Sequence, residues 1–221
     1  MITVHHLNNS RSQRVLWLLE ELELPYEIVK YERDPKTMLA PASLRKIHPL
    51  GKSPVITDGD ATIAESGAIL EYLVETHGKG TLVPQQGTPA YRHYRYFLHY
   101  AEGSLMPLLV MKLVFNKVKT DAPLLIRPIA RTIAGTVSRR FLDPNLGTHL
   151  GFLGGHLAKH TWFTGDAFTA ADVHMSFPIE GAVARSGDRI PPPLTEWLAR
   201  VQARPAYRRA LERGGDFKVM S

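Results

Sequence analysis

The chain changes its hydrophobic pattern once, near residue 80, and this change limits the fold more than any other feature of the sequence. Before it, short segments rich in β-branched residues alternate with segments whose apolar residues recur every three or four positions. After it, only the helical spacing recurs. Such a switch predicts a mixed layer followed by a purely helical one. We expect an α/β half at residues 1–78, a linker at residues 79–89 and an all-helical half at residues 90–221.

The N-terminal half predicts one small mixed sheet with helices packed on it. The expected strands and helices, in chain order, are Ile2–Leu7 (strand), Val15–Leu22 (helix), Tyr26–Tyr31 (strand), Leu44–Ile47 (short helix), Pro54–Ile56 (strand), Ala61–Ile63 (strand) and Ser66–Gly78 (helix). A helix joins the first two strands, so these should pair in parallel. Asp58-Gly59 is typical of the tight turn of a hairpin between the last two strands.

The C-terminal half shows no strand pattern. Its five expected helices are separated by Pro or Gly and lie at Tyr91–Lys119, Pro123–Phe141, Leu146–His160, Thr169–Ala184 and Leu194–Leu211. Thr169 and Asp172 have the spacing of a helix cap, in which the third helical residue reaches back to the start. We interpret both residues as structural and not as catalytic.

The composition excludes several kinds of protein. The chain has no cysteine, so it can form no disulfide, thiolate metal site or cysteine nucleophile. None of its ten histidines has a spacing typical of a metal site, so we expect no metal. No run approaches the roughly 18 apolar residues of a membrane helix, and no signal peptide is recognisable. We therefore expect a cytoplasmic protein with no membrane partner.

Charge is unevenly distributed along the chain. Residues 1–80 contain 9 Lys and Arg against 11 Asp and Glu, a balance of −2, whereas the remaining residues contain 18 against 10, a balance of +8. The basic residues are scattered along helical faces, without the aromatic platform or recognition helix of nucleic-acid readers. We therefore expect a solvated basic surface and no nucleic-acid partner.

Ser10 follows the first expected strand and precedes the first helix, and two interpretations are open. Ser10 and Gln13 have the spacing of a capping box, which is a structural device. The same helix start has unpaired N–H groups and a positive dipole end, which favour an anion. The motif taken alone favours the cap.

Two further segments admit a structural and a binding interpretation. Pro54 begins a strand, where a cis Ser53–Pro54 bond exposes the backbone of Val55 to an extended, peptide-like ligand and a trans bond merely starts the strand. Glu65 and Ser66 precede a helix, where they form either an ordinary cap or a site for a carboxylate and an ammonium group.

Taken in this order, the segments resemble the glutathione transferase superfamily. The matching features are Ser10 after the first strand, Lys52-Ser53-Pro54-Val55, Glu65-Ser66, the FTAAD motif at residues 168–172 and Arg204-Pro205-Ala206-Tyr207. The resemblance covers almost the whole chain, and LNNSRSQRVLWLLEEL is most similar to the bacterial and fungal branch with a serine at the first helix. It implies an α/β N-terminal thioredoxin-like domain that holds glutathione, plus an all-α C-terminal helical domain.

The resemblance assigns a role to each binding motif. In the superfamily, the residues that match Glu65 and Ser66 hold the γ-glutamyl end of glutathione. The match of Lys52 meets the glycine carboxylate. The residue that matches Pro54, which follows Ser53, has a cis peptide bond. The residue that matches Val55 pairs with the backbone of the cysteinyl residue of glutathione.

The resemblance also places a hydroxyl at the thiol. The residue that matches Ser10 donates a hydrogen bond to the sulfur, with Ser12 and then Asn9 as alternatives within reach of the same place. A free thiol with a pKa near 8.5 is only about 3% ionised at pH 7. Lowering that pKa by about two units takes about 2.7 kcal/mol, roughly what one hydroxyl donor and a helix N-terminus supply.

These expectations define a function and its alternatives. We expect a transferase that conjugates glutathione, its co-substrate, to hydrophobic electrophiles, with peroxide reduction or isomerisation as related reactions. The absence of cysteine disfavours thiol–disulfide exchange. A non-catalytic binding or scaffold protein with the same fold is the alternative, and a carrier of hydrophobic ligands is a third interpretation.

The first long helix of the C-terminal half is expected to line the pocket for the electrophile. Methionine adapts its shape easily and suits such a pocket. The expected lining residues are Tyr100, Glu102, Ser104, Met106, Pro107, Val110 and Met111. The superfamily usually assembles through both domains, so we also expect a homodimer.

Overall fold

The computed structural model describes residues 1–186 and 190–215. Its N-terminal half is a four-stranded sheet with the strand order β2-β1-β3-β4. The strands are β1 (Ile2–Leu7), β2 (Tyr26–Tyr31), β3 (Val55–Asp58) and β4 (Ala61–Ala64). β1 and β2 pair in parallel and the other neighbours pair antiparallel, as the crossover helix and the Asp58-Gly59 turn predict.

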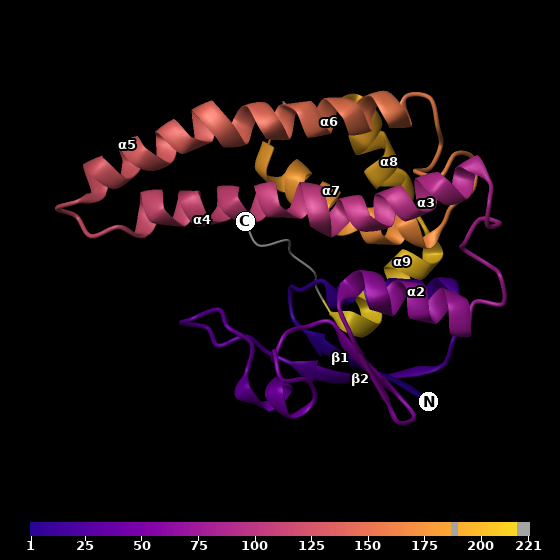
Figure 1. Ribbon diagram of the computed structural model, residues 1–221. Coiled ribbons are helices and arrows are strands. Elements are labelled where there is room, and N and C mark those ends of the chain that lie inside the picture. Colours follow the sequence, from indigo (N-terminus) through magenta and orange to yellow (C-terminus); the bar gives the residue numbers. More distant parts are fainter. Residues whose placement is uncertain (187–189, 216–221) are drawn as a thin grey trace.

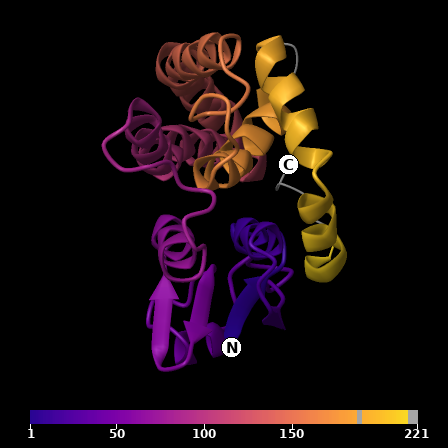
Figure 2. The same cartoon turned by 90° about the vertical axis from the view of Figure 1, so that its right-hand side faces the viewer.

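Two helices lie between this sheet and the helical half of the molecule. They are α1 (Ser12–Glu21) and α2 (Ser66–Thr76), and Figure 2 shows both on the sheet face that is turned toward the helical half. A short 3₁₀ helix, Ala42–Lys46, lies between β2 and β3. Val15, Leu18 and Leu19 of α1 are fully buried, and burial of each such side chain stabilises the fold by about 1.5–3 kcal/mol.

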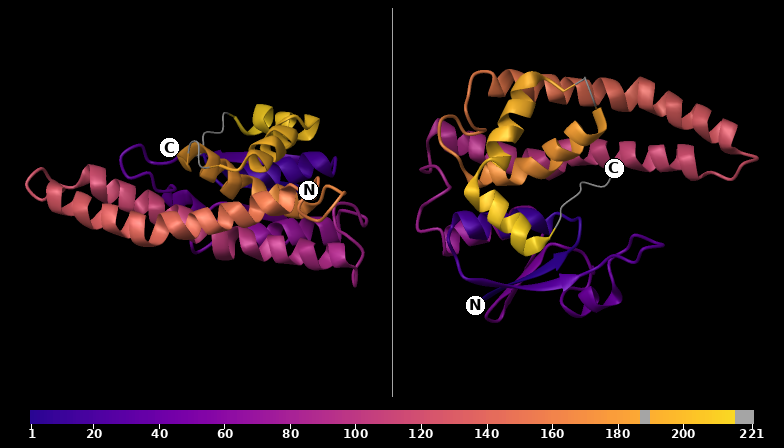
Figure 3. Two further views of the ribbon diagram at one scale, coloured as in Figure 1. Left: turned by 90° about the horizontal axis from the view of Figure 1, so that it is seen from above. Right: turned by 180° about the vertical axis from the view of Figure 1, so that it is seen from behind.

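Two long antiparallel helical rods dominate the C-terminal half (Figures 1 and 3). The first consists of α3 (Pro89–Tyr100), a π-helical turn (Ala101–Leu105) and α4 (Met106–Asp121). The second consists of α5 (Arg127–Val137), another π-helical turn (Ser138–Leu142) and α6 (Asp143–Leu157). α7 (Ala170–Ser186), α8 (Pro192–Gln202) and α9 (Pro205–Gly214) complete the described chain. The predicted fold class, a thioredoxin-like α/β part followed by an all-α part, is confirmed.

Two helix predictions are wrong, and proline explains both. Pro123–Phe141 and Leu146–His160 were expected to be separate helices, but the helical path continues from Arg127 to Leu157 because a π-helical turn lies directly before Pro144. Such a turn widens the helix where the proline ring would meet a carbonyl. Leu194–Leu211 was expected to be one helix, but it divides at Pro205, which has no N–H and starts α9.

The hydrophobic core runs through both halves without interruption. Trp17 of α1, Leu73 of α2, Phe97 of α3 and Trp197 of α8 belong to the same buried cluster. α1 packs against α2 of its own half and against α7 and α9 of the helical half, so helices from both halves hold the helix that begins at the site. Within the described residues, no helix is both long enough and apolar enough to cross a membrane.

Candidate active site

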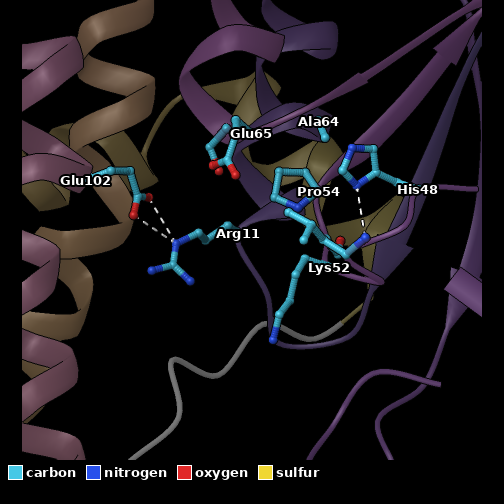
Figure 4. A pocket seen from close by; sticks show the side chains of 10 residues that line it. Arg11, His48, Lys52, Pro54, Ala64, Glu65 and Glu102 are labelled. Atoms are coloured by element: carbon cyan, nitrogen blue, oxygen red, sulfur yellow. Dashed lines mark hydrogen bonds and ion pairs between the residues drawn. The ribbon is translucent and has the colours of Figure 1, made fainter. Parts of the chain in front are cut away.

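A cavity of about 240 Å³ opens where the start of α1, the loop before β3 and the start of α2 meet. Figure 4 shows Lys52, Pro54 and Glu65 around it, with Arg11 and Glu102 closing one side. Its walls are mostly polar. The lining residues are Arg11, His48, Leu50, Lys52, Ser53, Pro54, Ala64, Glu65, Ser66 and Glu102.

A chain of hydroxyl groups lies at the end of β1, beside this cavity. Ser10 Oγ is 2.7 Å from Ser12 Oγ and 3.4 Å from Ser53 Oγ, and Ser53 lines the cavity. Ser12 Oγ is also 2.9 Å from Nδ1 of His6. Ser12 is fully buried, and Ser10 is nearly so. The three hydroxyl groups therefore form a path from the cavity to a buried imidazole.

The protonation state of His6 determines which hydroxyl groups donate and which accept along this chain of hydrogen bonds. Burial and then the charge of Lys30 lower the pKa of His6 to about 4, while a hydrogen bond to the backbone of Gly214 opposes them. His6 is therefore neutral at pH 7 and carries one ring proton. A carbonyl can only accept a hydrogen bond, so the ring N–H of His6 donates to the carbonyl of Gly214. Nδ1 is then unprotonated and accepts a hydrogen bond from the hydroxyl of Ser12. Ser12 thus uses its hydroxyl inside the fold, and Ser10 provides the next hydroxyl toward Ser53, which lines the cavity.

The capping box predicted for Ser10 and Gln13 forms only in part. Ser10 Oγ accepts a hydrogen bond from the backbone N–H of Ser12 at 3.2 Å and so satisfies one N–H of the first turn, whereas Arg11, the residue before α1, makes no side-chain capping bond. The buried amide group of Gln13 has no hydrogen-bond partner among the described residues, so it does not reach back to the helix start. The turn at Asn9, with a φ of 48°, aims the chain so that Asn9 and Arg11 face a second cavity.

The peptide bond between Ser53 and Pro54 is cis, and both residues line the cavity. Val55, expected from the sequence to meet the ligand, lies elsewhere: it is 1% exposed and pairs with His5 on one side and Ala64 on the other. Its position inside the sheet leaves no room for a ligand. Ser53 lies two residues before Val55, outside the paired residues, and lines the cavity.

Glu65 has an unusual backbone conformation at the mouth of the cavity. Its φ is 72°, a value that residues with a side chain rarely adopt and that costs about 1–3 kcal/mol. This backbone conformation redirects the chain from β4 into α2, and Glu65 and Ser66 both line the cavity. Ser66 is not an ordinary cap, since its hydroxyl accepts a hydrogen bond from Arg14 at 3.1 Å.

Arg14 is a buried cation that ties the site together, and it is 2% exposed. Its guanidinium donates to Ser66 Oγ, to the backbone carbonyl of His174 at 2.7 Å and to a carboxylate oxygen of Glu102 at 2.5 Å. A buried guanidinium is tolerated only with such partners. Burial raises the pKa of Glu102, but the charges of Arg14 and Arg11 outweigh burial and hold that pKa below its usual value.

The second cavity, of about 80 Å³, lies between the Asn9 turn and the helical half. Most of its wall is apolar. Its lining residues are Asn9, Arg11, Met106, Leu109, Val110, Leu113, Phe177 and Arg185. Arg11 lines both cavities, so the two adjoin at that side chain.

The residues that the sequence predicted for an electrophile pocket are divided by the structure. Met106 and Val110 line the second cavity, and Glu102 lines the first. The others line neither. Tyr100 is buried on another face of its helix, where its hydroxyl contacts His149, and Ser104, Pro107 and Met111 are absent from both walls.

Thr169 and Asp172 lie away from both cavities. The carboxylate of Asp172 accepts hydrogen bonds from the backbone N–H of Thr169 and of Phe163, each at 3.0 Å, and from the indole of Trp197 at 3.3 Å. These bonds cap α7 and tie it to α8. Burial, opposed by the hydrogen bonds, raises the pKa of Asp172 to about 6.

Known proteins resemble this chain along its whole length. Glutathione S-transferase 3 from Schizosaccharomyces pombe is 37% identical to this chain over 217 residues, which cover 98% of this chain and 89% of the relative. The chain belongs to the glutathione S-transferase family. Residues 1–75 match the family's N-terminal domain, described as "Glutathione S-transferase, N-terminal domain".

Two solved structures share the fold of this family member. A glutathione S-transferase from Actinobacillus pleuropneumoniae has a TM-score of 0.80 and 31% identity, covering 97% of this chain and 93% of its own. A glutathione transferase family member from Pseudomonas fluorescens, with two glutathione molecules bound, has a TM-score of 0.74 and 27% identity, covering 96% of this chain and 92% of its own.

The structure of this family member adds site residues that sequence reasoning missed. His48 and Leu50 line the first cavity, and no sequence signal distinguished them. Arg14 had a signal that was not used, because a charged residue stood beside Val15 and Leu18 on a helix expected to be buried. In residues 1–186 and 190–215, no three His, Asp or Glu side chains are placed to hold a metal ion.

Proposed function

We propose that this protein is a glutathione transferase that joins the glutathione thiolate to hydrophobic electrophiles, chemistry suited to detoxification in the cytoplasm. Family membership supports the activity, and the polar cavity supports the site. The observation that carries the proposal is the position of Ser10 Oγ, 3.4 Å from Oγ of Ser53, which lines the cavity beside the start of α1.

The cavity offers a partner for each end of a tripeptide with two carboxylates and an ammonium group. Lys52 is a cation for the glycine carboxylate. Glu65 is an anion for the ammonium group, and the start of α2 at Ser66 receives the second carboxylate. Between them, Ser53 presents backbone groups that precede the β-ladder and suit a peptide-like ligand.

Ser10 is the proposed donor to the thiolate. Without ligand, its hydroxyl proton points to Ser12 Oγ, 2.7 Å away. Rotation about the Cβ–Oγ bond redirects that proton to a sulfur near Ser53, without a change in the backbone. The start of α1 adds a positive dipole end, so together they favour the thiolate over the thiol. Attack on the electrophile then follows from proximity in the adjoining cavity.

The test is the pH dependence of thiolate absorbance for bound glutathione in the wild type, Ser10→Ala and Ser12→Ala. Loss of one hydrogen bond to a charged acceptor should raise the thiol pKa in Ser10→Ala by about 1–2 units. Ser12→Ala removes the competing acceptor of the Ser10 proton, so its thiol pKa should stay low or fall further.

Each other outcome assigns a different role. An unchanged pKa in Ser10→Ala together with a raised one in Ser12→Ala would transfer the donor role to Ser12. An ordinary thiol pKa in the wild type would overturn the enzyme and leave a glutathione-binding scaffold. Binding of apolar anions without glutathione would favour a carrier.

We also propose a homodimer. Val110, Val114 and Val118 form an exposed apolar stripe with a spacing of four residues on α4, and Ile129 and Ile133 do the same on α5. An apolar stripe of this kind is typical of an interface. Sedimentation equilibrium at micromolar concentration should give twice the mass of one chain, and the single-chain mass would refute the dimer.

A further inference from the structure

The second cavity combines an apolar wall with two cationic side chains. Met106, Leu109 and Phe177 supply apolar surface, and Arg11 and Arg185 line the same space. A pocket for a purely hydrophobic electrophile has no need of arginine, because a cation beside an apolar ligand loses hydration without gaining a partner. The two arginines therefore indicate that the ligand is not purely apolar.

Arg11 is held where the two cavities meet. Its Nε donates to both carboxylate oxygens of Glu102, at 3.0 and 3.1 Å, and its guanidinium lies 5.4 Å from the ring centre of Phe177. Figure 4 shows its two terminal nitrogens turned away from Glu102. The ion pair thus fixes the arginine by one nitrogen and leaves the flat, two-nitrogen edge to a ligand.

Among the residues that the structure describes, the positive charges around the cavity outnumber the negative ones. Arg11 and Arg14 share the single carboxylate of Glu102, so this group alone has a net charge of +1. Arg185, half-buried, adds a further positive charge and donates to a neutral partner, the carbonyl of Gly181, at 3.3 Å. Glu180 also faces Arg14, but burial raises its pKa to about 7, so it offsets only part of this charge near neutral pH.

Neighbouring groups respond to this positive excess. Burial and then the charges of Arg14 and Arg11 lower the pKa of His174 well below its usual value. Burial and then the charge of Arg11 lower the pKa of Arg33. Both groups lie in a positive potential, which is also the potential that an anionic ligand would meet at this cavity.

We propose that the second substrate is an apolar electrophile that carries a carboxylate, and that Arg11 and Arg185 bind this carboxylate as specificity-determining residues. This inference rests on the proposed function and names its substrate class. A guanidinium edge matches the two oxygens of a carboxylate, and the apolar wall receives the rest of the molecule. Discrimination against a neutral analogue follows, because the analogue brings no anion to the positive excess at the two arginines.

The reaction used for the test is aromatic substitution on 4-chloro-3-nitrobenzoate, with 4-chloro-3-nitrobenzamide as the neutral analogue. The glutathione sulfur forms a bond to the ring carbon, the carbon–chlorine bond breaks, and chloride leaves with its electron pair. Each kcat/KM is divided by the rate of the same compound with free glutathione thiolate, which removes the difference in intrinsic reactivity. The wild type should prefer the benzoate by about tenfold or more, a difference of about 1.4 kcal/mol. The preference should shrink in 0.5 M NaCl.

Arg185→Gln is the decisive variant, because Arg185 lines only the second cavity. It should reduce kcat/KM for the benzoate at least about fivefold more than for the benzamide. Arg131→Gln on α5, where the side chain is exposed and remote, removes the same net charge and should leave the preference intact. Equal values for the two compounds in the wild type, or equal loss of preference in both variants, would overturn the inference.

Failure of the proposed function is distinguishable from failure of this inference. Conjugation of the benzamide without preference for the benzoate would retain the transferase and reject the carboxylate site. If neither compound reacts, the transferase fails, and calorimetric titration with unreactive 4-nitrobenzoate and 4-nitrobenzamide still tests the site. Tighter binding of the benzoate, lost in Arg185→Gln and kept in Arg131→Gln, would support it, and equal binding would reject it.

Discussion

At the scale of single residues, the site is built from side chains held in unfavourable states. Glu65 has a φ of 72°, and Arg14 is a charge almost without exposure to solvent. Each state costs free energy, and each is held by its surroundings: the β4–α2 connection holds Glu65, and Ser66, Glu102 and the His174 carbonyl hold Arg14. Strain and buried charge at one cavity indicate that the cavity is used for binding.

The first prediction concerns the strained backbone. Glu65→Gly should raise the free energy of unfolding by about 1 kcal/mol, because relief of a strain of about 1–3 kcal/mol exceeds the entropic cost of glycine. The same change should weaken glutathione binding, since the carboxylate is lost. Urea unfolding and calorimetry measure the two effects. Lys79→Gly, at a φ of 49° in the linker, is the matched control and should alter stability alone. A fall in stability for Glu65→Gly would contradict the strain argument.

At the scale of elements, α9 joins the end of the chain to α1 and explains much of the uneven charge. Arg204 makes two hydrogen bonds to Glu21, at 2.6 and 2.7 Å, and Arg209 and Arg213 pair with Glu20. Basic residues of the helical half therefore meet acidic residues of the α/β half. A Cβ atom at Gly214 would lie 2.7 Å from Leu16 Cδ1, so α9 can approach α1 this closely only with glycine there.

The second prediction compares two of these arginines. Arg204 is partly buried, binds Glu21 with two bonds and lies 3.7 Å from the ring centre of Phe168. Arg204→Gln should therefore lower the free energy of unfolding by about 1–2 kcal/mol. Arg209→Gln, at an exposed ion pair, should have a much smaller effect that vanishes in high salt. Urea titrations of both variants, with and without 0.5 M NaCl, test this; equal effects would show that α9 is not held in the way described.

At the scale of the whole molecule, buried ionisable groups make the stability depend on pH in two opposite directions. The pKa of His6 is lowered to about 4, so its contribution is complete above pH 6.5 and is lost as the pH falls toward 4. Burial raises the pKa of Asp172 to about 6 and that of Glu180 to about 7. Their contributions are complete at low pH and are lost as the pH rises through those values. The two carboxyl groups therefore lower the stability as the pH rises, and His6 lowers it as the pH falls.

The third prediction isolates the alkaline side of this curve. Glu180 accepts a hydrogen bond from Tyr207 at 2.6 Å, and glutamine can accept the same bond without a charge. In the wild type, the contribution of Glu180 to the unfolding free energy should fall by up to about 3 kcal/mol between pH 5 and pH 8. Glu180→Gln should flatten that fall, whereas Glu196→Gln, at an exposed position on α8, should not. Thermal unfolding across this pH range provides the measurement; identical slopes in all three proteins would refute it.

Local patterns in the sequence were enough to predict the fold class and the segments that form the cavity. Alternation and helical spacing are properties of neighbouring residues, so the strands, the crossover helix and the change near residue 80 could be inferred without coordinates. The positions of Ser10, Ser53 and Glu65, each at a junction between a strand and a helix or loop, followed from the same patterns and from the resemblance.

Only the tertiary structure decided which side chains face the site. Val55 is a sheet residue paired with both neighbouring strands, and the cavity is lined two positions earlier by Ser53, because the point at which ladder pairing begins depends on the neighbouring strands. Similarly, Arg14, Glu102 and Arg185 come from separate helices and form one charged group only after the two halves pack. A sequence pattern shows which face of a single helix or strand is apolar or charged. The charge at the second cavity depends on which of these faces pack together in the tertiary structure.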